Sequence, residues 1–138
     1  MEIVSFEIAK KLKEKGFRCK HPIAMYNEDG MFCPLYTSAD HNEDIKCIFG
    51  NREYYDYDDF DSRDFIAPTI SQVLKWLREE KKLHVVFPFY EDKGFYYYVQ
   101  RIGNAARIVS SFDDSDTCFD TAELAALAGI KYCLDNLI

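Results

Sequence analysis

The chain has 138 residues, 48% of them apolar and 16% aromatic, and it carries a formal net charge of −7. A chain of this length fits one domain that buries roughly 68% of its unfolded surface, so general disorder is excluded. The 11 Phe and 10 Tyr favour strands over an all-helical bundle. We therefore expect residues 1–138 to form a single α+β domain, an antiparallel sheet packed by about three helices.

The sequence favours a cytoplasmic location. No apolar run approaches the ~18 residues that a membrane span requires, and residues 1–7 lack the basic and apolar regions of a signal peptide. The five cysteines, an odd number, are typical of reduced thiols in the cytosol. We expect no membrane contact and no cofactor, and we leave homo-oligomerisation open.

The negative charge is concentrated in the middle of the chain. Between Asp40 and Asp64 there are nine acidic residues and three Lys or Arg, a local balance of −6. A phosphate backbone is bound by Lys and Arg that displace its counterions, so this balance disfavours nucleic acid as a partner.

The first predicted elements are a helix and a hairpin. The helix begins at Ser5, which can cap it, and ends at Lys15, because Gly16 can close it in a left-handed turn. The hairpin pairs Cys19–Tyr26 with Met31–Tyr36 around an Asn-Glu-Asp-Gly turn.

The residues that follow carry few structural signals. Ile45–Phe49 fits one short strand, and residues 53–66 interleave Tyr and Phe with Asp. We interpret 53–66 as a loosely structured acidic aromatic connection, with one edge strand as an option, between two halves, 1–52 and 67–138.

The second half predicts the order helix, strand, strand, strand, helix. Capping boxes, in which side chains bond the free amides of a helix start, begin the two helices at Thr69–Gln72 and Asp120–Glu123. Pro88 cannot donate a ladder hydrogen bond, so the first strand should lie at an edge or carry a bulge. The expected strands are Leu83–Tyr90, Phe95–Ile102 and a third near Ala105–Ser110.

The two halves share a sequence pattern. A shift of 65 residues places Ile8–Lys10 on Val73–Lys75, and a shift of 64 places Gly30 on Gly94. Both halves then read helix, strand, turn ending in Gly, strand. Duplication explains this pattern, and so does independent convergence of two helix-plus-hairpin units.

Cysteine chemistry has two candidate forms. Five residues are of the types that zinc prefers as ligands, namely Cys19, His21, Cys33, His41 and Cys47. No Cys-x-x-Cys pair occurs among them, and buried reduced thiols are the alternative. Cys118 lies among acidic residues and Cys133 on an apolar helix face, and neither setting favours a reactive thiolate.

Oxygen ligands that suit calcium occur at Asp56–Asp61. An EF-hand starting at Asp56 would need Gly and Glu where Asp61 and Ala67 stand, so a solvated acidic stretch is the preferred interpretation. The chain also lacks the P-loop, G-x-G-x-x-G, H-E-x-x-H and G-x-S-x-G motifs. We therefore predict no metal site and name no catalytic residue.

Aromatic residues are the candidate binding groups. Alternation along Phe95–Val99 places Tyr96 and Tyr98 on one strand face, where they can contact a partner if helices cover only the other face. Packing of the rings across strands is the alternative. With the rings of the acidic segment, the candidate partner-binding residues are Tyr54, Tyr55, Tyr57, Phe60, Tyr96 and Tyr98.

Five stretches together form a family pattern. They are Ser5–Lys10, Tyr54–Tyr57, Ala67–Thr69, Lys75–Glu79 and Gly94–Tyr98. With them, most of the chain resembles a group of short uncharacterised proteins from gut bacteria and their prophages or mobile elements. The resemblance implies a cytoplasmic accessory protein, and it supplies no activity, cofactor or catalytic residue.

The sequence thus predicts a non-enzymatic accessory protein, of phage or mobile-element origin, that acts through contacts with an unknown protein partner. One alternative is a nucleic-acid-associated protein that uses the Tyr-rich strand as a stacking platform. The other is a small enzyme with an unrecognised site.

Overall fold

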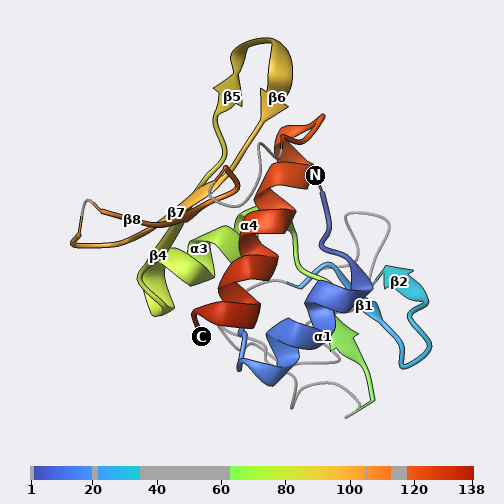
Figure 1. The fold of residues 1–138 in the computed structure, drawn as a ribbon. Helices are drawn as coiled ribbons and strands as arrows, with labels where there is room; N and C mark the ends of the chain where they lie inside the picture. The colour runs from blue at the N-terminus through green and yellow to red at the C-terminus, as the bar shows by residue number, and fades with distance from the viewer. Residues whose placement is uncertain (1, 20–21, 35–62, 105, 113–117) are drawn as a thin grey trace. The chain divides into compact units, whose positions relative to one another are not determined.

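A computed structural model describes residues 2–19, 22–34, 63–104, 106–112 and 118–138. Within these ranges the protein has three α-helices and antiparallel sheets, which confirms the α+β class (Figure 1). The chain divides into two compact units. We call Ile3–Thr69 the N-terminal unit, and Ile70–Ile138 with Met1–Glu2 the C-terminal unit.

The N-terminal unit starts with helix α1 (Phe6–Glu14), at the position that the sequence predicts. The Ser5 side chain accepts a hydrogen bond from the backbone N–H of Ile8 at 3.3 Å, which caps the helix. Gly16 follows the last turn with a φ of 76°, a left-handed conformation that glycine adopts without strain. These local signals determine both ends of α1.

Three short antiparallel strands complete the N-terminal unit. They are β1 (Ala24–Tyr26), β2 (Phe32–Pro34) and β3 (Phe65–Ile66), in the order β2-β1-β3. The expected hairpin is present, but β1 begins later than predicted, because Pro22 has no amide hydrogen for a strand ladder. The strand expected at Ile45–Phe49 lies outside the described residues.

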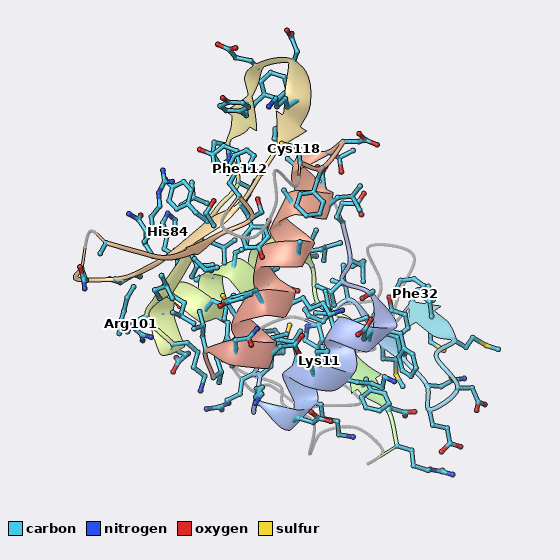
Figure 2. All side chains as sticks on the ribbon, in the orientation of Figure 1. Lys11, Phe32, His84, Arg101, Phe112 and Cys118 are labelled. Carbon is cyan, nitrogen blue, oxygen red and sulfur yellow. The ribbon has the colours of Figure 1, made fainter. Side chains whose placement is uncertain are left out.

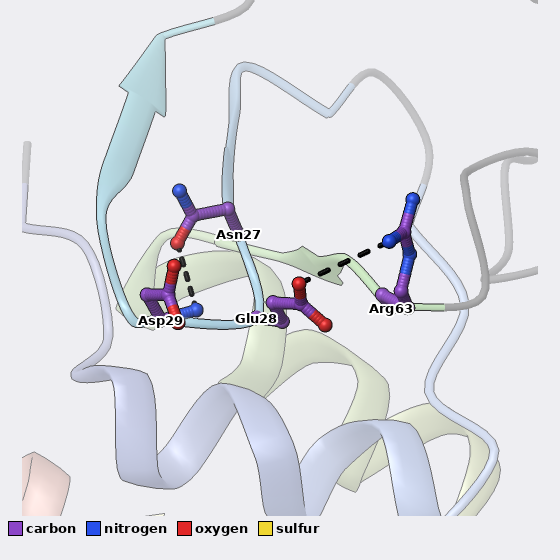
Figure 3. Close-up of polar contacts among 4 residues, drawn as sticks. All are labelled: Asn27, Glu28, Asp29 and Arg63. Atoms are coloured by element: carbon purple, nitrogen blue, oxygen red, sulfur yellow. Dashed lines mark hydrogen bonds and ion pairs between the residues drawn. The ribbon is translucent and has the colours of Figure 1, made fainter.

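Asn27 builds the turn of this hairpin. Its side-chain oxygen accepts hydrogen bonds from the backbone N–H groups of Asp29 and Met31, each at 2.9 Å. Figure 3 shows the bond to Asp29 beside an exposed ion pair, in which Glu28 lies 3.9 Å from Arg63. The turn thus depends on the Asn side chain, since an exposed ion pair adds little stability.

In the C-terminal unit two helices cover one face of a three-stranded sheet. The helices are α3 (Ile70–Glu80) and α4 (Ala122–Asn136). The strands are β4 (Leu83–Val86), β7 (Tyr98–Arg101) and β8 (Arg107–Ser110), antiparallel in the order β4-β7-β8. Both helices contact β4, and α4 also contacts β7 (Figure 1). The buried side chains include Val73, Leu77, Val85, Val99 and Ile130.

Two of the predicted strands are each split in two. The first becomes β4 and β5 (Phe89–Tyr90), and the second becomes β6 (Gly94–Phe95) and β7, with a short 3-10 turn, η2 (Glu91–Lys93), at the tip. The break lies at Pro88, which accepts a hydrogen bond from Tyr96 N at 3.1 Å but has none to donate. The interruption that Pro88 predicts is therefore present, and β5 and β6 form a separate hairpin.

The cap of α4 differs from the prediction by one residue. Thr121 Oγ1 accepts a hydrogen bond from Leu124 N at 3.1 Å, so Thr121 is the N-cap. A capping box at Asp120–Glu123 is therefore wrong, because the third helical position holds a leucine that cannot return the bond. By contrast, α3 begins at Ile70, directly after its predicted cap residue.

Gly129 lets α4 lie close to the sheet. A Cβ atom at this position would stand 2.6 Å from Val85 Cγ1 and 3.2 Å from the Tyr97 ring. The distance to Val85 is shorter than the contacts that Cβ atoms make in proteins. Because Gly129 has no side chain, the helix can pack directly against Val85 and Tyr97. On β7, Tyr98 precedes the buried Val99, so its side chain points to the opposite face, where the Tyr96 ring lies 6.2 Å from it.

Candidate interaction surface

Four aromatic rings meet on the side of the C-terminal sheet that α3 and α4 leave uncovered. We call Tyr90, Tyr96, Tyr98 and Phe112 the aromatic face. Tyr96 is its centre, with its ring centroid 4.6 Å from that of Phe112 and 6.2 Å from those of Tyr90 and Tyr98. Phe112, labelled in Figure 2, also lies 5.5 Å from the Tyr90 ring.

Hydrogen bonds between Tyr97 and Ser111 hold these rings in place. Tyr97, next to Tyr96, donates its N–H to Ser111 Oγ at 3.2 Å and accepts from Ser111 N at 2.9 Å. These bonds tie the segment after β8 to the segment between β6 and β7. Phe112 is thereby brought beside Tyr96, although the two residues are far apart in the sequence.

Two cations lie against the aromatic face. Arg107 Cζ stands 4.1 Å from the Tyr98 ring centroid, and Lys93 Nζ stands 5.7 Å from that of Tyr90. Each such contact contributes about 0.5–1 kcal/mol at an exposed site. Residues 81–112 contain five Lys or Arg and two acidic residues, a balance of +3 in a chain whose net charge is −7. Two cations thus lie beside the rings, although Asp113, Asp114 and Asp116 follow Phe112 directly in the sequence.

A β-bulge aims Arg107 at this face. Val99 pairs with Val109 but its neighbour Gln100 pairs with Arg107, so Ile108 has no partner on β7. Without the extra residue, alternation from Val109 would turn Arg107 toward the helices. The bulge instead places Arg107 in one row with Gln100 and the facing residue of β4, His84.

That row borders a pocket of about 410 Å³ near the turn between β7 and β8. Its walls come from β4, the end of β7 and the turn itself. The lining residues are His84, Gln100, Arg101, Ile102, Gly103 and Asn104. Since Tyr98 lies two residues before Gln100 on the same strand, the pocket and the aromatic face adjoin.

Of the candidate binding residues, the structure brings Tyr96 and Tyr98 together. The candidates Tyr54, Tyr55, Tyr57 and Phe60 lie outside the described residues. The rings also pack on one another, as the alternative to partner binding expects. Their role in binding therefore stays a prediction. Sequence reasoning missed Tyr90, Phe112 and Arg107.

The cysteines that the structure describes do not form a reactive centre. Burial raises the pKa of Cys19 and of Cys133 to about 12, so both thiols are protonated at neutral pH. Cys33 Sγ lies 3.5 Å from the carbonyl oxygen of Met31, to which it donates. No three His, Cys, Asp or Glu within the described ranges are placed to hold a metal ion. The candidates His21, His41, Cys47 and Asp56–Asp61 lie outside those ranges.

Comparison of the chain with protein-family models, curated proteins and solved structures finds no match in any of the three. None of the helices in the described part of the chain combines the length and apolar character that crossing a bilayer requires. The arguments for function therefore come from the site itself.

Proposed function

We propose that this protein is a non-enzymatic interaction protein that binds a protein partner through the aromatic face. The observation that carries the proposal is the placement of four rings and Arg107 on the sheet face opposite the helices. Tyr and Arg are enriched in the strongest contacts of protein interfaces. Rigid rings also cover partner surface at a low cost in conformational entropy.

The hairpin of β5 and β6 extends the proposed surface. Phe89 is 62% exposed and Tyr90 is 46% exposed, and the Phe89 ring packs edge-on against Phe95 at 5.2 Å. Apolar rings at the end of a hairpin offer contact area to a partner. Because Arg107 and Lys93 lie against the rings, the partner surface that suits the aromatic face is acidic.

The proposal places the protein in the cytoplasm as an accessory factor of phage or mobile-element origin, as the family resemblance implies. The aromatic residues of the acidic segment are proposed as a second contact with the partner. They are Tyr54, Tyr55, Tyr57 and Phe60.

Single-stranded nucleic acid is a second candidate partner, and the local charge is the observation that favours it. A ring cluster with Arg107 and Lys93 beside it combines stacking with positive charge, as single-strand binding surfaces do. The net charge of −7 opposes this reading, because it repels a repeating phosphate backbone at long range. The protein partner is therefore preferred.

Photo-crosslinking from two matched positions tests the proposal. Lys10 provides the control, because its Nζ lies 4.7 Å from the Phe6 ring, so a cation rests on a ring there too, in the N-terminal unit. We would place benzoylphenylalanine at position 107 or at position 10 and irradiate the protein in lysate of its native host. A nuclease-resistant protein adduct, formed from position 107 at least fivefold more often than from position 10, is expected.

Two results would count against the proposal. Equal yields from the two positions would mean that the aromatic face has no special affinity for protein. Adducts that nuclease treatment removes would instead support the nucleic-acid reading.

A further inference from the structure

The pocket beside the aromatic face is lined by hydrogen-bond donors. His84 contributes an imidazole, Gln100 and Asn104 contribute amides, and Arg101 adds a positive charge. No acidic side chain is among the six lining residues. Donors and a cation without a competing carboxylate are the surroundings that suit an anionic oxygen ligand.

The environment of His84 determines which ring nitrogen can donate into the pocket. Its Nδ1 is buried and has no hydrogen-bond partner. A buried N–H without an acceptor is costly, so we assign Nε2 as the ring nitrogen that donates. With the Nδ1 edge covered, the opposite edge of the ring, which carries Nε2–H, is left to line the pocket.

The turn fixes the amide of Asn104 in a similar way. Its Oδ1 accepts a hydrogen bond from Ala106 N at 3.0 Å, and its backbone N–H donates to the Arg101 carbonyl at 3.1 Å. Since the oxygen is held by the turn, the NH₂ group is the side-chain atom that can donate to a ligand. Asn104 thus offers a second oriented donor beside His84.

We propose that this pocket binds a carboxylate of the protein partner, so that the surface recognises an acidic side chain beside an aromatic one. The inference rests on the proposed function and names the chemistry of the partner. A pocket of about 410 Å³ has room for an Asp or Glu side chain. Tyr98 precedes Gln100 by two residues on β7. In an extended partner segment, residues i and i+2 have the same separation, so one can contact Tyr98 while the other enters the pocket.

A carboxylate fits this pocket better than a chain of phosphates does. The pocket offers a few donors at one place, whereas a nucleic-acid backbone carries a charge at every nucleotide. The chain as a whole has a net charge of −7, which a single carboxylate tolerates more easily than a polyanion does. Acidic peptide is therefore the source we commit to.

Backbone-amide NMR titration of the full chain with two blocked pentapeptides tests the inference. The probe is acetyl-Asp-Ser-Tyr-Ser-Asp-amide, which presents an acid two residues from Tyr in either direction, and its match carries Asn in place of Asp. We expect saturable shifts at Gln100, Gly103 and Tyr98, with roughly tenfold weaker binding of the Asn peptide, because charge-assisted hydrogen bonds are lost.

A pair of Asn→Asp variants locates the effect in the pocket. Asn104→Asp keeps the oxygen that bonds Ala106 N but replaces the donor with a negative charge. Asn27→Asp is its match, because Asn27 Oδ1 also holds a turn and the charge changes equally (Figure 3). The Asp peptide should bind Asn104→Asp roughly tenfold more weakly and Asn27→Asp nearly unchanged.

The outcomes separate this inference from the proposed function. Equal binding of the Asp and Asn peptides, with shifts confined to Tyr96 and Tyr98, would overturn the pocket and leave the aromatic face as a binding surface. Equal weakening by the two variants would overturn it as well, because net charge alone would explain the result. Displacement of the Asp peptide from Gly103 by oligothymidylate at near-physiological salt would assign the pocket to nucleic acid instead.

Discussion

Each unit contains a hairpin that follows a helix, and the two hairpins use matching residues differently. In the N-terminal unit Tyr26 pairs with Phe32 across the turn held by Asn27. In the C-terminal unit Tyr90 pairs with Gly94 across η2. The shift of 64 residues that matches Tyr26 to Tyr90 therefore does not reproduce the pairing. The comparison shows that the turn glycine recurs while the strand register differs between the two hairpins. Duplication and convergence both stay open as explanations of the shared pattern.

The matched tyrosines also differ in what their rings do. Tyr26 donates its hydroxyl to the Val4 carbonyl at 2.6 Å, and its ring packs 5.5 Å from Phe6 and 5.7 Å from Phe32. That ring ties helix α1 to its sheet. Tyr90 is 46% exposed and belongs to the aromatic face. A ring at an equivalent place is thus structural in one unit and available for contact in the other.

The largest expected difference concerns thiols, because the described residues of each unit include one buried cysteine and one partly exposed cysteine. With a pKa of about 12 against an ordinary 9.0, Cys19 and Cys133 form roughly a thousandfold less thiolate than a free thiol does. At pH 8 we expect Cys33 and Cys118 to react with a maleimide about a hundredfold faster than Cys19 and Cys133 do. Mass spectrometry of the labelled native protein measures the four rates. Comparable rates for Cys19 and Cys33 would show that the N-terminal core opens readily.

Glycine substitutions at the two hairpins should differ next. Gly94 has a φ of 107°, and a Cβ there would lie 2.6 Å from the Phe119 carbonyl oxygen, which is backbone. Gly30 has a φ of 85°, and its Cβ would meet the Phe6 ring at 2.8 Å, a side chain that can turn aside. We expect Gly94→Ala to lower the free energy of unfolding by roughly 2–4 kcal/mol and Gly30→Ala by about 1–2 kcal/mol. Urea unfolding measures both values, and a larger loss at Gly30 would contradict the comparison.

Local chemistry explains what could be predicted of this fold. Ser5 and Gly16 determine the two ends of α1, and Pro88 interrupts its own strand. Each of these effects depends on a few neighbouring residues, so the sequence alone predicts it. The predicted cap of α4 is wrong by one residue, because Asp120 and Thr121 are adjacent and both residue types are good caps.

The candidate surface was harder to predict because it depends on long-range register. Arg107 reaches Tyr98 only through the bulge at Ile108, and no residue type signals that shift in the sequence. Phe112 meets Tyr96 only after Tyr97 and Ser111 have paired. Alternation alone could therefore place Tyr96 and Tyr98 together, but not the groups around them.

The pH dependence of stability should follow the buried thiols in both units. Each thiol is protonated when folded up to a pKa of about 12 but ionises near 9.0 when unfolded. The unfolded state therefore binds fewer protons above pH 9, and stability falls as pH rises from 9 to 12. The expected loss is about 1.4 kcal/mol per pH unit for each thiol.

Chemical unfolding at pH 8.5, 9.5 and 10.5 measures this loss. Cys19→Ala and Cys133→Ala should each remove one thiol's share of the slope, at the cost of a small cavity. A slope that neither substitution changes would assign the alkaline loss to other groups.

The smallest expected effect compares the two helix caps. Ser5 caps α1 and Thr121 caps α4, each by accepting one backbone N–H. We expect Ser5→Ala and Thr121→Ala each to lower the free energy of unfolding by about 1 kcal/mol, because one helix-start amide loses its acceptor.

Aspartate at the same positions is the control. Ser5→Asp and Thr121→Asp keep an oxygen acceptor and add a negative charge that the positive end of the helix dipole favours. Both variants should therefore retain the original stability within about 0.5 kcal/mol. Because α4 has 15 residues and α1 has nine, fraying after loss of the cap removes a larger share of α1. Hydrogen exchange should consequently rise throughout α1 in Ser5→Ala but only in the first turn of α4 in Thr121→Ala. Confinement of the rise to the first turn of α1 would mean that packing against the N-terminal sheet, rather than the cap, holds that helix.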